Sequence, residues 1–551
     1  MSKTRTNIMV CGGTGCLASD SEKVAKNLEL IIKARGYEEE AKVIQTGCFG
    51  FCEQGPIVKI EPDNVFYVRV GPKDAKDIVD EHIVKGRKVE RLLYKEPHHN
   101  KKIGKQEDME FYKKQLRIAL RNCGLINPED IYEYIALGGY EALGKALTQM
   151  SRDEVVKEVK ESGLRGRGGG GFPTGVKWEI TKSQESEVKF IICNADEGDP
   201  GAFMDRSILE GDPHSVIEAM AIGGYAIGAD KGIVYIRAEY PLAISRLKTA
   251  IKQSRELGLL GKNIFDSDFS FDIDIKFGAG AFVCGEETAL INSCEGKRGE
   301  PDFKPPFPAQ EGYWGHPTNV NNVETFANIP PIITKGSEWF SSIGTEKSKG
   351  TKVFALAGKI NNVGLVEVPM GTTLREIIFD IGGGIQGGKK FKAVQTGGPS
   401  GGVITEEYLD TPIDYDSLLS IGSMMGSGGM IVMDETDNMV NIAKFYLEFT
   451  MDEACGKCAA GRIGTKRLYE ILNKITSGKA TMADLDALKQ LSYMVKGSSL
   501  CGLCQTAPNP IISTMKHFWD EYLAFIKDVD HSQGEGEYDG AKNKDNLMLK
   551  A

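Results

Sequence analysis

The sequence predicts an α/β multidomain protein whose last folded segment is a bundle of helices. With 551 residues, the chain is long enough for three or four domains. Strand-like and helix-like segments alternate up to about residue 430, whereas the segment 435–527 shows helical periodicity only. Most of the 12 cysteines gather in two groups, one in the first α/β unit and one in the helical segment. We therefore expect three α/β domains and a helical bundle.

The composition is that of a globular chain, with 41% hydrophobic and 26% charged residues. No run of 18 apolar residues is present, so no transmembrane segment is expected. A net charge of −10 argues against a nucleic-acid partner, and residues 1–10 lack the features of a signal peptide. We therefore expect a cytoplasmic protein. Clustered cysteines in a chain without an export signal favour bound metal over disulfides.

The first predicted domain spans residues 1–95 and mixes short strands with helices. Strands are expected at 7–10, 42–45, 57–60 and 65–70, and helices at 21–35 and 74–84. Its loops carry one cysteine pair at Cys11 and Cys16 and another at Cys48 and Cys52. Two such pairs can converge on a two-iron cluster, although four thiolates also suit zinc. The order of elements and the cysteine spacing resemble the thioredoxin-like [2Fe–2S] ferredoxin domain, which implies a [2Fe–2S] cluster.

The second predicted domain, residues 106–340, follows a polar linker at 96–105 and contains a glycine-rich stretch at 163–178. Glycine lets backbone N–H groups converge on an anion, and Arg165, Arg167 and Lys177 add positive charge. Phe172 offers a flat face for a ring. This combination suggests a phosphate-bearing aromatic cofactor.

The same stretch matches the spacing G-x-G-x-x-G at Gly166, Gly168 and Gly171. The dinucleotide fingerprint requires a strand before these glycines, but the charged segment 153–162 reads as a helix. The predicted helix before the glycines therefore argues against an ordinary Rossmann dinucleotide site. A flexible linker is the alternative to a cofactor-binding loop. Pro173 and Gly175 are expected to keep the stretch from continuing as a helix.

The remainder of this domain alternates helices and strands. Helices are expected at 111–120 and 128–147, and strands at 188–192 and 269–277. The first of these strands runs into an acidic turn, at the strand end where α/β sheets bind ligands; the turn carries Asn194, Asp196, Glu197 and Asp199. Later motifs add further candidates: Gly285, Glu286 and Glu287 at a helix start, Lys304 and Phe307 in a proline-stiffened loop, and Asn321 and Asn322.

Four ordered motifs resemble the FMN- and NADH-binding flavoprotein subunit of respiratory complex I and its relatives in NAD-linked hydrogenases and formate dehydrogenases. These motifs lie at 163–178, 193–200, 278–287 and 317–325. The resemblance covers about residues 110–520 and implies a Rossmann-like FMN/NADH domain. It implies that FMN is held by the glycine loop with Gly166, Arg167 and Gly168, and by Lys177, Asn194, Asp196, Glu286, Asn321 and Asn322. It implies that NADH stacks on the flavin near Phe172, Glu197, Asp199, Glu287 and Lys304. Gly285 and Phe307 are further cofactor-binding candidates. The sequence departs from relatives at Ile180 and Phe282, where an aromatic residue and a tyrosine are usual.

The third predicted domain, residues 350–430, resembles the small ubiquitin-like (SLBB) domain of the same family. Strands are expected at 352–359, 365–368 and 392–396, and a helix at 374–379. The glycine run at 397–402 is interpreted as structural.

The predicted helical bundle, residues 435–527, carries the second cysteine group. Its helices are expected at 441–451, 463–477, 482–495 and 510–526, followed by a disordered tail at 528–551. The loops between them hold Cys455 and Cys458, and Cys501 and Cys504. Relatives usually supply a third cysteine where this chain has Gly461, so we hypothesise that Cys504 replaces it. Four thiolates suit a [4Fe–4S] or a [2Fe–2S] cluster, with zinc as the alternative.

Together these features predict an NADH:acceptor oxidoreductase (diaphorase) subunit that passes electrons through FMN and iron–sulfur clusters. The N-terminal ferredoxin domain resembles a fusion found in the beta subunit of multimeric NADH-dependent [FeFe]-hydrogenases, some of them electron-bifurcating. We therefore expect a hetero-oligomer with a hydrogenase catalytic subunit and a small thioredoxin-like [2Fe–2S] subunit. A formate dehydrogenase or a complex I-like module is the alternative assembly, and a non-catalytic electron-transfer scaffold is the alternative of another class.

Overall fold

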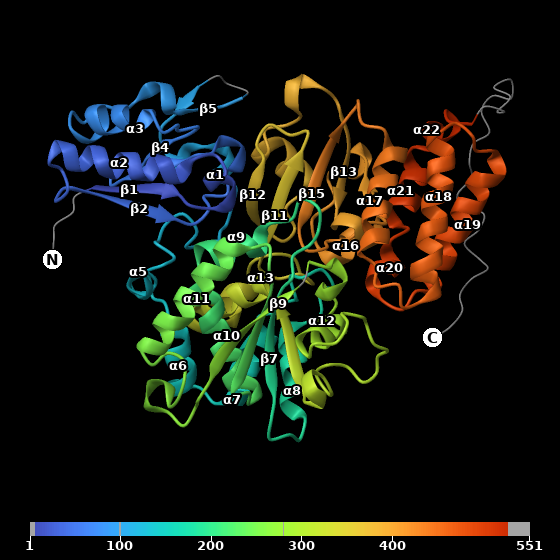
Figure 1. Cartoon of the computed structure of the whole chain (residues 1–551), viewed down its shortest axis with the longest axis horizontal. Coiled ribbons are helices and arrows are strands. Elements are labelled where there is room, and N and C mark those ends of the chain that lie inside the picture. Colours follow the sequence, from blue (N-terminus) through green and yellow to red (C-terminus); the bar gives the residue numbers. More distant parts are fainter. Residues whose placement is uncertain (1–5, 98–100, 279, 527–551) are drawn as a thin grey trace.

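Three β-sheets, a β-hairpin and a C-terminal group of helices make up the computed structural model, which describes residues 6–97, 101–278 and 280–526. Figure 1 shows the N-terminal sheet at the upper left, the second sheet at the lower centre, the third at the upper centre and the helices at the right. The predicted α/β multidomain class is confirmed. The tail predicted to be disordered, 528–551, lies outside the described residues.

The N-terminal sheet has the strand order β2-β1-β3-β4. Its strands are β1 (Thr6–Cys11), β2 (Ala41–Thr46), β3 (Val58–Glu61) and β4 (Val65–Tyr67). Helix α2 (Ser21–Arg35) packs on it through Val24, Leu28 and Ile32, which recur every four residues and so share one helix face. Helix α3 (Asp74–Asp77) follows, and continues as a π-helical turn to Ile83. The predicted linker contains strand β6 (Lys102–Ile103), which pairs with β5 (Tyr94–Lys95).

The second sheet consists of four parallel strands in the order β10-β7-β8-β9. They are β7 (Phe190–Ala195), β8 (Lys231–Arg237), β9 (Asp272–Gly278) and β10 (Thr318–Asn322). Helices α10 (Pro213–Ile227), α11 (Pro241–Glu256) and α12 (Glu287–Cys294) connect or flank them. The strand order changes direction between β7 and β10. Open α/β sheets bind ligands outside the carboxyl ends of the strands at such a point, and we call this edge of the sheet the crevice.

The third sheet has the order β12-β11-β15-β13-β14. Its strands are β11 (Thr351–Gly358), β12 (Gly364–Pro369), β13 (Phe391–Thr396), β14 (Val403–Ile404) and β15 (Gly429–Asp434). The expected helix at 374–379 is a π-helical segment, Glu376–Ile381. Its edge strand β12 contacts the N-terminal unit, where the Leu365 N–H donates to the Gly50 carbonyl (2.7 Å).

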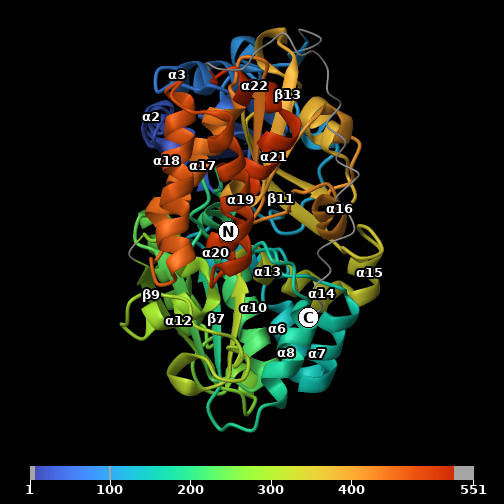
Figure 2. The same cartoon turned by 90° about the vertical axis from the view of Figure 1, so that its right-hand side faces the viewer.

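The C-terminal helices are α17 (Met439–Glu453), α18 (Thr465–Thr476), α19 (Met482–Ser498), α20 (Gly502–Thr506), α21 (Asn509–His517) and α22 (Trp519–Leu523). Figure 2 shows α17 and α18 above α12 and β7. The single helix expected at 510–526 breaks at Phe518, whose φ of −133° is not helical. Among the residues that the structure describes, none of the helices combines the length and apolarity needed to span a bilayer.

Two predicted helices of the second domain are wrong in extent. The segment expected at 111–120 is helical only in α4 (Glu110–Lys113). The N–H groups of residues 118–120 instead donate to the buried carboxylate of Glu367, each at 2.9 Å, so they are not available for helical bonds. The segment expected at 128–147 forms α5 (Ile131–Ala136) and α6 (Glu141–Gln149), separated where Gly138 takes a φ of +87°.

The glycine-rich stretch also differs from its prediction. A helix, α7 (Arg152–Glu161), precedes it, as expected. However, helix α8 (Thr174–Ser183) starts directly after Pro173 and contains Gly175. A side chain at Gly175 would collide with the backbone of Lys160. Gly175 therefore lets α8 pack closely against α7. It does not end the helix.

Candidate functional site

The predicted ligand-binding residues meet at the carboxyl edge of the second sheet. Asn194, at the end of β7, donates through Nδ2 to the Gly285 carbonyl (2.8 Å), which ties β7 to the start of α12. Its Oδ1 accepts from the Asp196 N–H (3.0 Å). At the end of the neighbouring strand β10, Asn322 lies against the glycine loop, since a Cβ on Gly168 would be 3.0 Å from the Asn322 Cβ. The structure thus brings motifs from four parts of the chain together.

The glycine loop is a closed hairpin with an exposed backbone. The Gly166 N–H donates to the Phe172 carbonyl (2.8 Å), and the Tyr415 hydroxyl donates to the Gly166 carbonyl (2.7 Å). Gly171 has a φ of +63°, and a Cβ there would lie 2.6 Å from the Tyr415 ring, so only glycine fits. At Gly170, by contrast, a Cβ would meet nothing within 4 Å. The loop is therefore held in shape by the third unit while its tip stays open.

The two arginines of the loop bind protein groups. Arg165 donates through Nε to the Gly171 carbonyl (2.6 Å) and pairs with Asp416 (3.2 Å). Arg167 is completely buried, and its guanidinium donates to the carbonyls of Arg165, Lys349 and Thr351. Arg167 thus shapes the loop from behind, rather than presenting its guanidinium to a ligand as its place in the motif suggested.

Lys177 belongs to a network of two lysines and two glutamates at the start of α12. Its Nζ donates to Glu287 Oε2 (2.8 Å) and to the Val320 carbonyl (2.9 Å). Lys304 pairs with Glu286 (2.7 Å) and with Glu287 (2.9 Å). Burial alone would raise the pKa of Glu287, but Lys177 and Lys304 lower it to about 2. The network keeps a carboxylate ionised beside two cations.

The acidic turn after β7 contains a buried carboxyl group without a protein partner. Asp196 is 7% exposed, and neither of its carboxylate oxygens has a hydrogen-bond partner among the described residues. Burial raises its pKa to about 7. Because buried polar groups are nearly always satisfied, an unpaired carboxyl facing this crevice fits a ligand with hydrogen-bond donors, such as the flavin ring or its ribityl chain.

The other acidic and amide groups of the site are engaged with the protein. Glu197 accepts from the N–H groups of Asp205 (3.0 Å) and Arg206 (3.1 Å), and Asp199 accepts from the Ser427 hydroxyl. Asn321 accepts from Trp178 Nε1 (2.8 Å), and Asn322 caps helix α13 (Val323–Ala327) and donates to Asp205. Phe172 and Phe307 are half exposed, at 53% and 51%. The amides therefore fix the shape of the edge, whereas these two aromatic rings remain available for a planar ligand.

Replacing Asp196 with asparagine should weaken the pH dependence of stability in the FMN-free protein. The folded chain keeps the Asp196 proton up to about pH 7, whereas the unfolded chain releases it near its ordinary value of 3.8. Between these values the unfolded state binds fewer protons, so stability falls as pH rises, by about 1.4 kcal/mol per pH unit for one group. Glu197 and Asp199, with pKa values raised by burial to about 7 and about 6, act in the same direction. Thermal unfolding measured across the pH range between the unfolded and folded pKa values of Asp196 tests this, and an unchanged slope in Asp196→Asn would contradict it.

The N-terminal cysteines lie together against the second domain. The thiol of Cys11 interacts with those of Cys16 and Cys48, and the sulfurs of Cys48 and Cys52 are 4.0 Å apart. Between Cys11 and Cys16, the Thr14 N–H donates to Glu210 Oε2 (3.0 Å). Glu210 lies in helix α9 (Met204–Gly211), whose first N–H groups are those accepted by Glu197. A single short helix therefore connects the acidic turn of the crevice to this cysteine site.

The C-terminal cysteines lie against the opposite side of the second domain. The Cys455 carbonyl accepts from Arg298 (3.0 Å), and Lys457 pairs with Asp302 (2.9 Å). Cys501 caps helix α20, on which Cys504 lies. Within the described residues, no three His, Cys, Asp or Glu side chains are arranged so that they could hold a single metal ion. An iron–sulfur cluster differs from such a site, because its four thiolates bind several irons. Both cysteine sites thus contact the second domain, which also carries the crevice.

Several residues of the site were missed from sequence. Glu210, Asp205 and Ser427 make partly buried contacts with partners more than a hundred residues away in the chain. Their positions carry no motif, and only the spatial arrangement reveals them.

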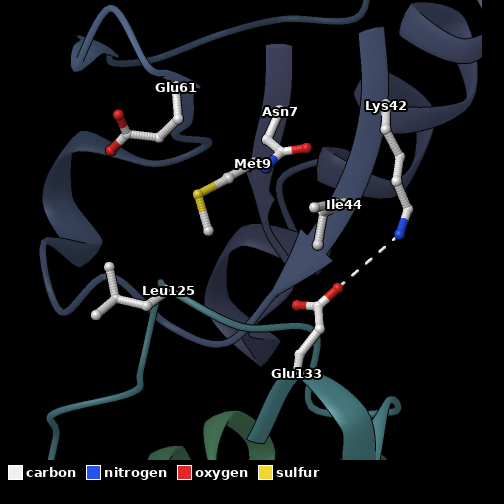
Figure 3. Close-up of a pocket in the computed structure, with 7 residues that line it drawn as sticks. All are labelled: Asn7, Met9, Lys42, Ile44, Glu61, Leu125 and Glu133. Carbon is white, nitrogen blue, oxygen red and sulfur yellow. Dashed lines mark ion pairs between the residues drawn. The ribbon is translucent and has the colours of Figure 1, made fainter. Parts of the chain in front are cut away.

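A separate hollow of about 490 Å³ lies at the junction of the N-terminal sheet and the second domain (Figure 3). Lys42 of β2 and Glu133 of α5 approach to 3.9 Å across its edge. None of the predicted ligand-binding residues lines it, so it marks the contact between two units and not the candidate site.

Comparisons with known proteins agree with this arrangement. Residues 159–331 match the Nuo51 FMN-binding domain, 441–525 the iron–sulfur binding region of NADH-ubiquinone oxidoreductase-F, and 2–82 the thioredoxin-like [2Fe–2S] ferredoxin. The chain thus has an FMN-binding domain and two iron–sulfur regions, as predicted, and the cofactors FMN, [4Fe–4S] and [2Fe–2S] follow.

Individual relatives extend the match over most of the chain. The NADP-reducing hydrogenase subunit HndC of Solidesulfovibrio fructosivorans is 70% identical over 416 residues, 76% of this chain and 84% of that protein. The F subunit of NADH-quinone oxidoreductase of Escherichia coli (strain K12) is 43% identical over 397 residues, 72% of this chain and 89% of that protein. A solved NAD⁺-reducing [NiFe]-hydrogenase in the H₂-reduced state is similar with a TM-score of 0.68 and 28% identity, over 96% of this chain and 85% of that one. The chain belongs to the family of FMN-binding, iron–sulfur oxidoreductase subunits that includes the F subunit of NADH-quinone oxidoreductase.

Proposed function

We propose that this chain exchanges hydride with NAD(H) at the carboxyl edge of the second sheet and passes electrons to a hydrogenase catalytic subunit. The observation that carries the proposal is that the two cysteine sites both contact the domain in which the predicted ligand-binding residues meet. Bound FMN supplies the conversion between two-electron hydride transfer and one-electron transfer. No side-chain acid or base is needed for hydride transfer between stacked rings, so the protein contributes binding and electrostatics.

We assign the residues of the crevice to two ligands. The open tip of the glycine loop at Gly170 and the cation of Lys177 would receive the FMN phosphate. Asn194 and Asp196 would receive polar atoms of the ribityl chain or ring. Phe172, Phe307 and Lys304 would lie near NADH. The unpaired carboxyl of Asp196 and the half-exposed aromatic rings support this division.

We propose NADH rather than NADPH as the preferred nucleotide. Asp199, with a pKa of about 6, and Glu287, with a pKa of about 2, are ionised carboxylates of this edge at pH 7. Negative charge disfavours a ribose 2′-phosphate. The relative HndC is described as NADP-reducing, which makes NADPH the second candidate. Rates of flavin reduction by the two nucleotides, measured on the same preparation, decide between them.

We propose a hydrogenase as the partner because HndC, a hydrogenase subunit, is 70% identical, whereas the F subunit of the Escherichia coli quinone oxidoreductase is 43% identical. A formate dehydrogenase or a complex I-like module remains the alternative assembly, and the catalytic subunit that copurifies would identify it. We further propose a separate small thioredoxin-like [2Fe–2S] subunit in the complex and a cytoplasmic location, which the 12 unpaired cysteines support.

Addition of NADH to the anaerobic protein should bleach the visible absorbance of the oxidised flavin. Reduced iron–sulfur signals should then appear in the EPR spectrum. A chain that contains iron but shows no flavin bleaching would be a non-catalytic electron-transfer scaffold, and this result would overturn the proposed activity.

A further inference from the structure

The C-terminal cysteine site contains a glycine whose side-chain space is already filled. A Cβ built on Gly461 would lie 2.9 Å from the sulfur of Cys504 and 3.0 Å from the sulfur of Cys458. Both distances are shorter than ordinary carbon–sulfur contacts, which lie near or above about 3.5 Å. The sulfur of Cys504 therefore occupies the volume that a side chain at 461 would need.

Cys504 reaches this place from a different element. Gly461 lies in a π-helical turn (Ala460–Gly464) that follows the loop of Cys455 and Cys458. Cys504 lies in the first turn of α20, three residues after Cys501, so both thiols share one helix face. Cys501 and Cys504 are 8% and 2% exposed, respectively. Cys458 from one element and Cys504 from the other thus both lie against Gly461.

The backbone around these thiols is arranged to support thiolate ligands. The Gly461 N–H donates to the Cys458 sulfur (3.3 Å), and the Lys457 N–H points to the Cys455 sulfur (3.5 Å). Hydrogen bonds to the sulfurs are one of the means by which proteins tune iron–sulfur sites. A buried cysteine that serves only as a small apolar side chain needs no such neighbours.

We propose that Cys504 is the fourth ligand of the C-terminal cluster and that its thiolate has been transposed from position 461, which is glycine to make room for it. The ligand set is then Cys455, Cys458, Cys501 and Cys504, two from each element. This inference rests on the proposed function only in taking the site as an iron–sulfur site.

Two variants test the transposition. Cys504→Gly alone should lose the C-terminal cluster, which lowers iron by about four atoms per chain for a [4Fe–4S] cluster. The double variant Gly461→Cys/Cys504→Gly should regain the iron, because the new thiol enters the vacated volume. Iron and acid-labile sulfide, together with the EPR spectrum of the dithionite-reduced full-length protein, provide the readout.

Matched measurements separate the outcomes. Cys294→Ser, a buried cysteine outside both groups, should keep all its iron, and FMN content in every sample reports whether the second domain has folded. Full iron in Cys504→Gly would overturn the proposal, as would a double variant that stays iron-poor although it retains FMN. Zinc in place of iron at this site in the wild type would overturn it too. Loss of flavin bleaching with intact iron affects the proposed function and leaves the ligand assignment standing.

Discussion

Replacing Lys352 with methionine is expected to lower the free energy of unfolding by about 3–5 kcal/mol, the range for a buried ion pair that loses one partner. Lys352 and Glu324 form a salt bridge in which the side chains are 0% and 1% exposed. Lys352 also donates to the carbonyls of Val353 (2.8 Å) and Ser427 (2.6 Å), and Glu324 accepts from the Val353 N–H (2.9 Å). The substitution leaves the Glu324 carboxylate buried without its cation.

The Lys352–Glu324 pair contributes strongly to stability because it joins two domains. Glu324 lies on α13, directly after the end of β10, and Lys352 lies on β11 of the third sheet. Burial raises the pKa of Glu324, and Lys352 opposes that rise. Without the lysine, the carboxyl should hold its proton to higher pH than in the wild type. The loss of free energy of unfolding in Lys352→Met, relative to the wild type, should therefore grow as pH rises.

Urea-induced unfolding followed by circular dichroism measures the effect, with the first transition compared between variants. Lys352→Met/Glu324→Gln should recover part of the loss, because a neutral amide still accepts from Val353. Arg375→Ala breaks an exposed pair with Asp410 (2.7 Å, side chains 45% and 71% exposed) and should cost less than about 1 kcal/mol. Equal destabilisation by the single and the double variant would contradict the charge argument.

The strand ends of the second sheet could be predicted from sequence because apolar runs end in polar turns there. A strand is expected at residues 188–192, and β7 spans Phe190–Ala195, so Asn194 and Asp196 do fall at its carboxyl end. Parallel strands place such ends at one edge. Strand β10, which brings Asn322 beside Asn194, is not predicted from sequence, because Thr-Asn-Val-Asn-Asn is not an apolar run. Local periodicity therefore locates the end of β7, and only the structure places Asn322 next to it.

The roles of individual side chains within the crevice could not be predicted in this way. Arg167 looks like a phosphate ligand in the motif, but three backbone carbonyls, two of them from distant segments, take its guanidinium. The helix expected at 111–120 fails for the same reason, because the carboxylate that captures its N–H groups, on Glu367, lies about 250 residues away. Long-range partners decide these cases, and periodicity carries no information about them.

Replacing Lys177 with alanine is expected to weaken FMN binding by about 10- to 100-fold, as for a lost hydrogen bond to a charged group of about 1.5–3 kcal/mol. An ammonium group carries three donors, and the described residues take two of them, through Glu287 and Val320. One donor remains for an incoming anion. The substitution also removes one of the two cations that lower the Glu287 pKa to about 2, so an anionic phosphate meets a less compensated carboxylate.

Titration of the FMN-free protein with FMN and with riboflavin gives the sharpest test. If Lys177 receives the phosphate, Lys177→Ala loses affinity for FMN while riboflavin, which lacks the phosphate, binds as it does to the wild type. Lys182→Ala is the matched control, since Lys182 lies on the same helix α8 but pairs with the exposed Asp153; its FMN affinity should not change. Equal FMN occupancy in Lys177→Ala and wild type would refute the assigned role. Because the arginines of the loop are held by protein groups, no other cation of the loop could then supply the charge that the phosphate needs, and the site would have to rely on backbone N–H groups alone.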